Sequence, residues 1–250
     1  MPDRFSARGR QGRARWRRRW WWLAAVAALV AAVVYLVAFS PVLVVEDVVV
    51  TGADEQVASM ARENADVAPG RPLARVDTEA VADRVAADTR IKTVEVSRGW
   101  PSSLTIAVTL REPRAVLTQP RRPPTLVDRS GVAYEAVATR PDELLRITAP
   151  RGSVARESLT GALQAHAALD QQTREEISVM DLTEDGELEF AVGSVTVVWG
   201  EPEGREAKAA AVRALLAQDG IDPESENALT IDVTAPRTPV VTGLSPAPAE

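Results

Sequence analysis

The sequence has no cysteine and only one histidine, His166. Disulfides, zinc–thiolate sites and cysteine nucleophiles are therefore excluded, and no second histidine can complete a zinc site or a serine–histidine pair. The glycine-bearing run 200–204, GEPEG, is acidic and does not suit a phosphate group. The sequence therefore predicts no cofactor, metal site or catalytic residue, and His166 is interpreted as an ordinary helix residue.

Aromatic residues are also scarce, at 4% of 250 residues, and three of the six tryptophans are adjacent, at 20–22. Alanine and valine must therefore fill most of the interior. Apolar residues make up 46% of the chain, which is enough for one or two packed domains. Trp199 is predicted to belong to a core. No interleaved basic and aromatic surface suggests a nucleic-acid partner.

Charge is distributed very unevenly along the chain. Residues 1–22 contain eight arginines and one acid, Asp3, which gives a net charge of +7. Residues 23–250 hold the other 21 basic and 34 acidic residues, a net charge of −13. The basic segment directly precedes an apolar run, so the asymmetry indicates a membrane-inserted end.

Residues 20–39 contain no charged side chain, and as a helix they would extend about 30 Å, the thickness of the hydrocarbon core of a bilayer. The arginines before this run predict a cytoplasmic tail at 1–19 and an extracytoplasmic location for the rest. The alternative is a cleaved signal peptide. Such peptides have shorter apolar cores that end in small residues, whereas Leu36, Val37 and Phe39 are bulky.

The first segment after the apolar run has the pattern β-α-α-β-β. A valine-rich strand is predicted at 44–50, and Asp54 and Asp77 are predicted to cap two short helices. Alternating apolar residues predict strands at 93–98 and 104–110, with a reversal at 99–102. The final strand is half-buried, because its apolar positions recur with a period of two.

A second pattern begins after the proline-rich run 120–124, which is interpreted as a joint between domains. Helices are predicted at 156–176 and 205–218. Residues 235–250 contain four prolines without a core pattern and are interpreted as a disordered tail. Short strands are predicted at 125–127, 132–134, 144–148, 178–182, 187–192, 195–199 and 229–234.

Both patterns resemble the FtsQ/DivIB family of bacterial cell-division proteins. The hairpin SRGWPSSLTIAVTLREPRA (Ser97–Ala115) and the opening valines before Gly52 are similar to its POTRA domain. The turn Leu126–Gly131, the helix carrying Lys208 and the closing Ile231–Val233 are similar to its β domain. Two positions depart from the family pattern, at Thr89–Ile91 and Leu110, without disturbing the apolar positions.

The resemblance implies an α+β chain. It consists of a basic cytoplasmic tail at 1–19, a transmembrane helix at 20–39, a POTRA domain at 43–115, an FtsQ-type β domain at 120–235 and a disordered tail at 236–250. It further implies a non-catalytic scaffold at the division septum that binds the FtsB/DivIC–FtsL pair and regulates septal peptidoglycan synthesis. The resemblance leaves open whether further partners bind through the POTRA domain. No nucleic acid or small-molecule substrate is expected. The alternative is a membrane-anchored cell-wall enzyme.

The last predicted strand is the candidate partner site. It is expected at or near a sheet edge, where a partner can add a strand, as the resemblance implies for FtsB/DivIC. The alternation does not show which face is outward, and a paired core strand covered by the tail is the alternative. The candidate binding residues are Leu229, Thr230, Ile231, Asp232, Val233 and Thr234. The residues predicted to shape the POTRA hairpin are Arg98, Trp100 and Pro101.

Overall fold

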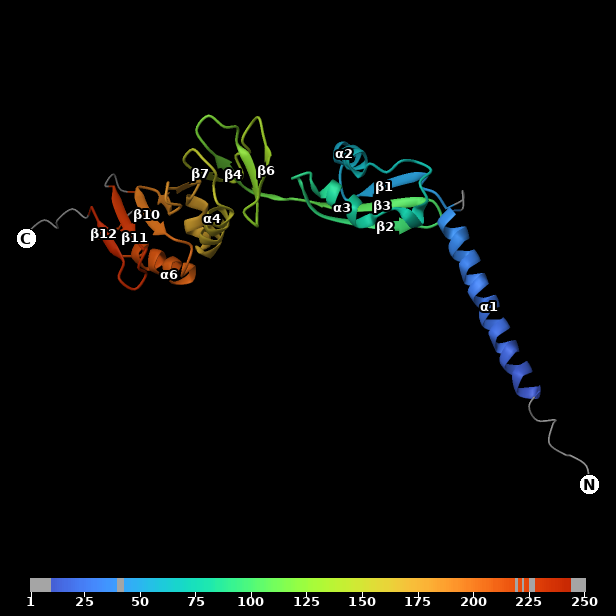
Figure 1. The fold of residues 1–250 in the computed structure, drawn as a ribbon. Helices are drawn as coiled ribbons and strands as arrows, with labels where there is room; N and C mark the ends of the chain where they lie inside the picture. Colours follow the sequence, from blue (N-terminus) through green and yellow to red (C-terminus); the bar gives the residue numbers. More distant parts are fainter. Residues whose placement is uncertain (1–9, 40–42, 219, 222, 225–227, 244–250) are drawn as a thin grey trace, which may run out of the picture. The chain divides into compact units, whose positions relative to one another are not determined.

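The computed structural model describes residues 10–39, 43–218, 220–221, 223–224 and 228–243. The chain divides into two compact units, 1–110 and 111–250 (Figure 1). Parts of the predicted cytoplasmic tail (1–9) and of the predicted disordered tail (244–250) lie outside the described residues.

The first helix, α1, runs from Arg10 to Phe39 and includes the apolar run predicted as an anchor. Its three adjacent tryptophans, at 20–22, are exposed. Within the described ranges, no helix meets the length and hydropathy needed for a membrane span. The transmembrane helix therefore stays a prediction.

The rest of the first unit is a three-stranded sheet with helices. The strand order is β1-β3-β2, with β1 parallel and β2 antiparallel to β3. The elements are β1 (Asp47–Thr51), α2 (Glu55–Ala65), the short 3-10 helix η1 (Leu73–Arg75), α3 (Thr78–Ala86), β2 (Ile91–Gly99) and β3 (Ser103–Leu110).

Local chemistry explains why these elements begin and end where they do. Asp54 Oδ1 accepts a hydrogen bond from Val57 N at 2.9 Å, and Asp77 Oδ1 accepts one from Ala80 N at 3.1 Å. Both predicted N-caps are therefore confirmed. Gly52 follows β1 with φ +89°, and a side chain there would meet the carbonyl of Val108.

The core of the first unit consists of short aliphatic side chains. Leu104, Ile106 and Val108 of β3 alternate inward, as predicted, and are almost fully buried. They pack against one face each of α2 and α3. The other buried members of this core are Val45, Val57, Ala61, Ala65, Leu73, Val76, Val81, Val85 and Ile91.

The second unit is built on a nine-stranded mixed sheet with the order β12-β11-β10-β9-β8-β7-β4-β5-β6. Its strands are β4 (Pro113–Thr118), β5 (Thr125–Asp128), β6 (Ala133–Ala136), β7 (Leu145–Thr148), β8 (Val179–Leu182), β9 (Leu188–Val192), β10 (Val195–Gly200), β11 (Leu229–Asp232) and β12 (Val240–Thr242). Its helices are α4 (Arg156–Ala168), α5 (Gln171–Glu176) and α6 (Arg205–Leu216).

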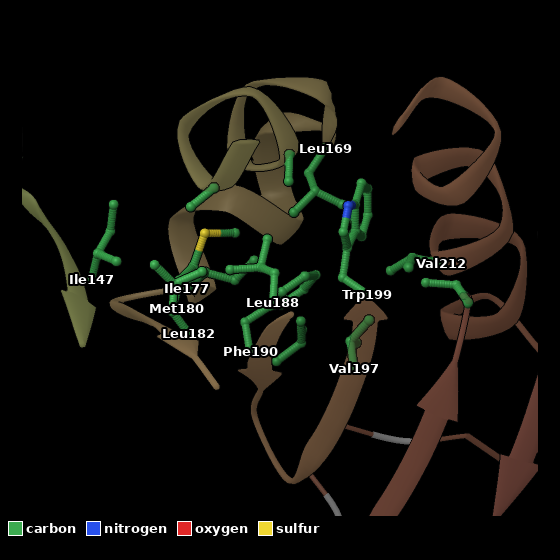
Figure 2. Close-up of a cluster of buried hydrophobic side chains, with 14 of the residues drawn as sticks. Ile147, Leu169, Ile177, Met180, Leu182, Leu188, Phe190, Val197, Trp199 and Val212 are labelled. Atoms are coloured by element: carbon green, nitrogen blue, oxygen red, sulfur yellow. The ribbon is translucent and has the colours of Figure 1, made fainter. Parts of the chain in front are cut away.

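The core of the second unit is larger and includes aromatic rings (Figure 2). Trp199 is fully buried, as predicted, and its ring centroid lies 5.9 Å from that of Phe190. Side chains from α4 and α6 pack over the same cluster. This packing positions the strands β9, β10 and β11 that lead to the edge of the sheet.

The structure differs from three expectations drawn from the sequence. The loop 119–124 joins the paired strands β4 and β5, so it is a hairpin connection inside the second unit; the units meet between Leu110 and Arg111. The helix predicted at 156–176 is two helices, because Asp170 caps a new one by accepting from Thr173 N at 3.1 Å. The tail contains a strand, β12, and so is not disordered throughout.

Candidate interaction surface

The partner site predicted at 229–234 includes a strand paired on both sides. β11 runs parallel to β10 and antiparallel to β12, with Ile231 opposite both Val197 and Val241. β11 therefore lies near the sheet edge, as expected, but it does not itself offer an open edge. As in the alternative, residues of the tail cover β11, and the edge strand is β12.

The structure decides which face of this segment is outward. Leu229, Ile231 and Val233 are buried in the core of the second unit. The alternating residues are partly or fully exposed: Thr230, Asp232 and Thr234. Asp232 Oδ1 accepts hydrogen bonds from Thr234 N at 2.9 Å and Thr234 Oγ1 at 2.7 Å, which fix the chain as it leaves β11. The outward set is thus polar and locally ordered.

The edge strand β12 is short and only half covered. Val241 packs against the core, whereas Val240 is 55% exposed. β12 is last in the strand order, so within the described residues its outer side faces no strand. Such an edge presents unpaired N–H and C=O groups to a partner segment. Sequence reasoning missed β12 because the strand has only three residues and follows a proline, Pro239.

A buried lysine supports the strand beside this edge. Lys208 of α6 is 4% exposed, and its Nζ donates to the carbonyls of Trp199 at 2.9 Å and Glu201 at 2.8 Å. Burial lowers the pKa of the Lys208 ammonium, while nearby acids, including Glu203, oppose the shift. The lysine therefore ties α6 to the end of β10, which pairs with β11. The sequence indicated the helix that carries Lys208 but not the burial of its ammonium group.

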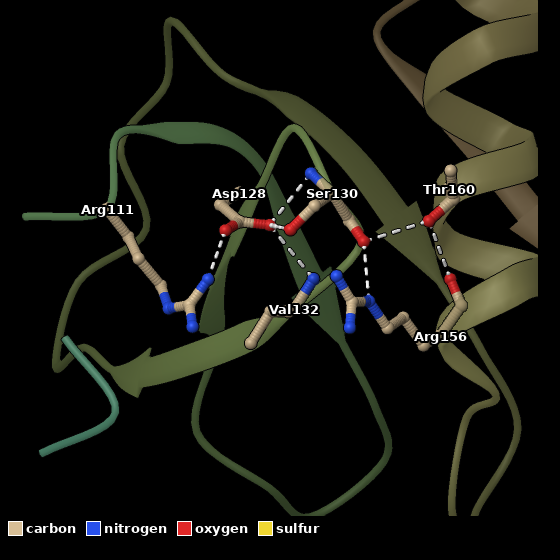
Figure 3. A network of polar contacts seen from close by, with 6 residues as sticks. All are labelled: Arg111, Asp128, Ser130, Val132, Arg156 and Thr160. Carbon is tan, nitrogen blue, oxygen red and sulfur yellow. Dashed lines mark hydrogen bonds and ion pairs between the residues drawn. The ribbon is translucent and has the colours of Figure 1, made fainter. Parts of the chain in front are cut away.

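A second polar centre lies where the second unit begins (Figure 3). Arg111 Nη1 donates to Asp128 Oδ2 at 2.6 Å, and the Asp128 side chain is 3% exposed. Asp128 Oδ1 also accepts from Ser130 N at 2.8 Å, Ser130 Oγ at 2.7 Å and Val132 N at 3.0 Å. These bonds form the turn between β5 and β6.

The carboxylate of Asp128 is held ionised by its donors. Burial alone raises its pKa, but the hydrogen bonds from Ser130, Val132 and Arg111 outweigh burial, so the pKa lies below the usual value. The same turn is tied to α4, because the Ser130 carbonyl accepts from Arg156 Nε at 2.9 Å and Thr160 Oγ1 at 3.0 Å. Asp128 thus acts structurally.

The POTRA hairpin residues separate into different roles. Arg98 donates from Nε to the carbonyl of Leu73 at 3.1 Å and from Nη2 to that of Val76 at 2.7 Å, which holds the hairpin against η1. Trp100 is 53% exposed, so its indole contributes little to the core of the first unit, and its role in shaping the hairpin stays a prediction. Pro101 lies beside it in the turn between β2 and β3.

The single histidine takes no part in either polar centre. His166 lies half-buried in α4, and burial lowers its pKa.

Comparison with known families assigns both units. A family model described as "POTRA domain, FtsQ-type" matches residues 43–111, and one described as "Cell division protein FtsQ/DivIB, C-terminal" matches residues 115–233. The chain belongs to the FtsQ/DivIB family. Its α+β fold, with a POTRA domain and a large β-sheet, agrees with the resemblance drawn from the sequence.

Curated relatives support this membership. The chain is 33% identical over 217 residues to "Cell division protein FtsQ" of Streptomyces bingchenggensis, covering 83% of this chain and 79% of that protein. It is 34% identical over 212 residues to the protein of the same name from Mycolicibacterium smegmatis, covering 82% of this chain and 59% of that protein. The chain therefore spans less than two thirds of the mycobacterial relative. FtsQ/DivIB proteins are cell-division proteins.

Proposed function

We propose that this FtsQ/DivIB-family chain is a non-catalytic scaffold of the division machinery, anchored in the cell membrane at the septum. In this role it binds the FtsB/DivIC–FtsL pair and regulates septal peptidoglycan synthesis. The observation that carries the proposal is the outer side of β12, which faces no strand within the described residues at the end of a well-packed sheet. Family membership supplies the cellular context.

In the proposed binding mode, the partner adds a strand to the outer side of β12. Backbone hydrogen bonds contribute part of the affinity, and exposed side chains contribute specificity. The predicted site 229–234 then contributes through its outward residues Thr230, Asp232 and Thr234, while the inward residues hold β11 in the core.

A pair of proline variants tests this mode. In an antiparallel ladder, neighbouring residues direct their N–H groups to opposite sides, so one of Val240 and Val241 donates toward β11 and the other points outward. Proline removes a donor. Of Val240→Pro and Val241→Pro, one should lower the melting temperature, and the other should weaken binding of the purified FtsB/DivIC–FtsL pair without affecting melting.

The matched control is Ala136→Pro in β6, the strand at the opposite edge of the same sheet. Its affinity for the purified pair, corrected for the folded fraction, should equal that of the unchanged chain. If both β12 variants fold and bind with full affinity, the partner does not pair with β12.

The proposed anchoring rests on the uncharged run 20–39 and the arginines before it. Because the chain has no cysteine, single cysteines can report its topology. In intact cells, a membrane-impermeant maleimide should label Thr93→Cys, which is exposed, but should label Arg13→Cys only after permeabilisation. Labelling of Arg13→Cys in intact cells would contradict the proposed orientation.

A further inference from the structure

One end of the first unit gathers the start of the folded chain and the tip of the β2–β3 hairpin. Because β1 is parallel and β2 antiparallel to β3, the first residue of β1 lies beside the turn 100–102. The amides of Glu46 and Asp47 both donate to the Ser102 carbonyl, at 2.8 and 3.4 Å. The hairpin tip is therefore bonded to residues only a few positions beyond α1.

A basic loop lies at the same end. The amide of Val45 donates to the Arg71 carbonyl at 2.9 Å, and the amide of Leu73 donates to the Leu43 carbonyl at 2.9 Å. These bonds hold the segment 71–75, which includes η1, against the chain just after α1. The side chains of Arg71 and Arg75 are exposed there.

Trp100 is exposed at this end, in a hairpin that hydrogen bonds hold in place. The indole is 53% exposed, whereas the other tryptophan outside the N-terminal segment, Trp199, is fully buried. The strand that leads to Trp100 is held by the two hydrogen bonds from the Arg98 guanidinium to η1. Exposed indoles with a fixed position are suited to membrane–water interfaces, where the ring is partly apolar and its N–H remains hydrated.

Chain length keeps this end close to the proposed anchor. Seven peptide units connect Phe39, the last residue of α1, to Glu46. Even fully extended, they span at most about 25 Å. Because the amide of Glu46 is hydrogen-bonded to the Ser102 carbonyl, the hairpin tip also stays within reach of Phe39.

We propose that the hairpin tip around Trp100 docks onto the phospholipid headgroup layer, with Arg71 and Arg75 facing anionic headgroups. This inference rests on the proposed membrane anchor. Exposed Glu46 and Asp47 lie at the same end and reduce the electrostatic attraction, so the indole provides the main contact and the arginines favour anionic over zwitterionic lipid.

The test places an environment-sensitive fluorophore at single cysteines of the full chain, reconstituted in vesicles of phosphatidylglycerol and phosphatidylcholine. Ser102→Cys reports the tip. Thr93→Cys, exposed in the same strand as Arg98 and about 20 Å from the turn, is the matched control. The label at Ser102→Cys should show a blue-shifted emission and protection from aqueous iodide, and the label at Thr93→Cys should show neither.

Adding Trp100→Ala to the Ser102→Cys chain should abolish both the blue shift and the protection, with an unchanged circular dichroism spectrum. Adding Arg71→Gln and Arg75→Gln should reduce protection in phosphatidylglycerol vesicles more than in pure phosphatidylcholine. Equal quenching at Ser102→Cys and Thr93→Cys in vesicle-embedded protein would overturn the docking proposal. Protection that survives Trp100→Ala would overturn the role of the indole.

Failure of the anchor gives a different result. If the chain is not embedded, extraction of the vesicles at alkaline pH releases it. Release would contradict both the proposed membrane anchor and the docking proposal. If the chain stays embedded while the tip is fully quenched, only the docking proposal fails.

Discussion

The two units build their hydrophobic cores from different kinds of side chains. The first unit fills its interior with short aliphatic side chains, and its exposed tryptophan takes no part in the core. The second unit buries Trp199, Phe190 and two charged residues, Lys208 and Asp128. We infer that the stability of the second unit depends on a few specific contacts, whereas the stability of the first unit is spread over many small aliphatic ones. Four substitutions test this contrast.

The largest effect is expected from Trp199→Ala. Removal of this fully buried ring leaves a cavity against Phe190 and should lower the free energy of unfolding by about 3–5 kcal/mol. Hydrogen–deuterium exchange measured by mass spectrometry should show faster exchange in peptides of 111–243 and unchanged exchange in peptides of 43–110. Equal acceleration in both units would show that their stabilities are coupled.

Asp128→Asn should have the next largest effect and should lower the free energy of unfolding by about 1.5–3 kcal/mol. The substitution removes the charge of a carboxylate that is hydrogen-bonded and ion-paired with Arg111. The pKa of Asp128 in the folded chain lies below its ordinary 3.8, so its stabilisation is present above about that pH and is lost as the pH falls through the folded pKa. Denaturant unfolding between pH 6 and 3 should show a weaker acid dependence in Asp128→Asn.

The matched control for that experiment is Asp142→Asn, whose carboxylate pairs with Arg140 but is 88% exposed. It should leave both the stability and its acid dependence unchanged. If stability depends on pH equally in the unchanged chain and in Asp128→Asn, other carboxylates determine that pH dependence.

Lys208→Met is expected to lower the free energy of unfolding by about 1–2 kcal/mol. The methionine keeps most of the side-chain volume but leaves the buried carbonyl of Trp199 without its donor. The exposed Glu201 can bond water instead, which limits the loss. Arg213→Met, at an exposed position of the same helix, should change the melting temperature very little. Equal stability of the two variants would show that the ammonium contributes nothing at this position.

The smallest effect is expected from Trp100→Ala. It should change the free energy of unfolding by no more than about 0.5 kcal/mol, because the indole is more than half exposed. Thermal unfolding of the full chain should scarcely change. A loss comparable to that of Trp199→Ala would show that Trp100 packs in the first unit after all.

Elements with strong periodicity were predictable from the sequence. The alternation in β3 and the two aspartate caps were found because their signals lie within a few residues. β4 was missed because its buried residues are consecutive: Ala115, Val116 and Leu117 all lie in cores, so no alternation appears.

The candidate site was only partly predictable for a different reason. The sequence placed the last long alternating strand correctly, but the identity of the edge depends on β12, which pairs in register across the intervening loop. Similarly, the exposure of Trp100 follows from how the hairpin packs on η1 through Arg98. The contacts of Arg98 join residues 22 and 25 positions apart and leave no periodic trace in the sequence, and the three residues of β12 are too few to show an alternation.

The connection between the units has a mechanical consequence. β3 ends at Leu110 and β4 begins at Pro113, so only Arg111 and Glu112 separate the two sheets along the chain. A pulling force transmitted through the backbone therefore reaches the second unit with almost no slack to absorb it. Arg111, the first residue of the second unit, is paired with Asp128 at 2.6 Å, so this ion pair is the first side-chain contact of that unit that such a force would reach.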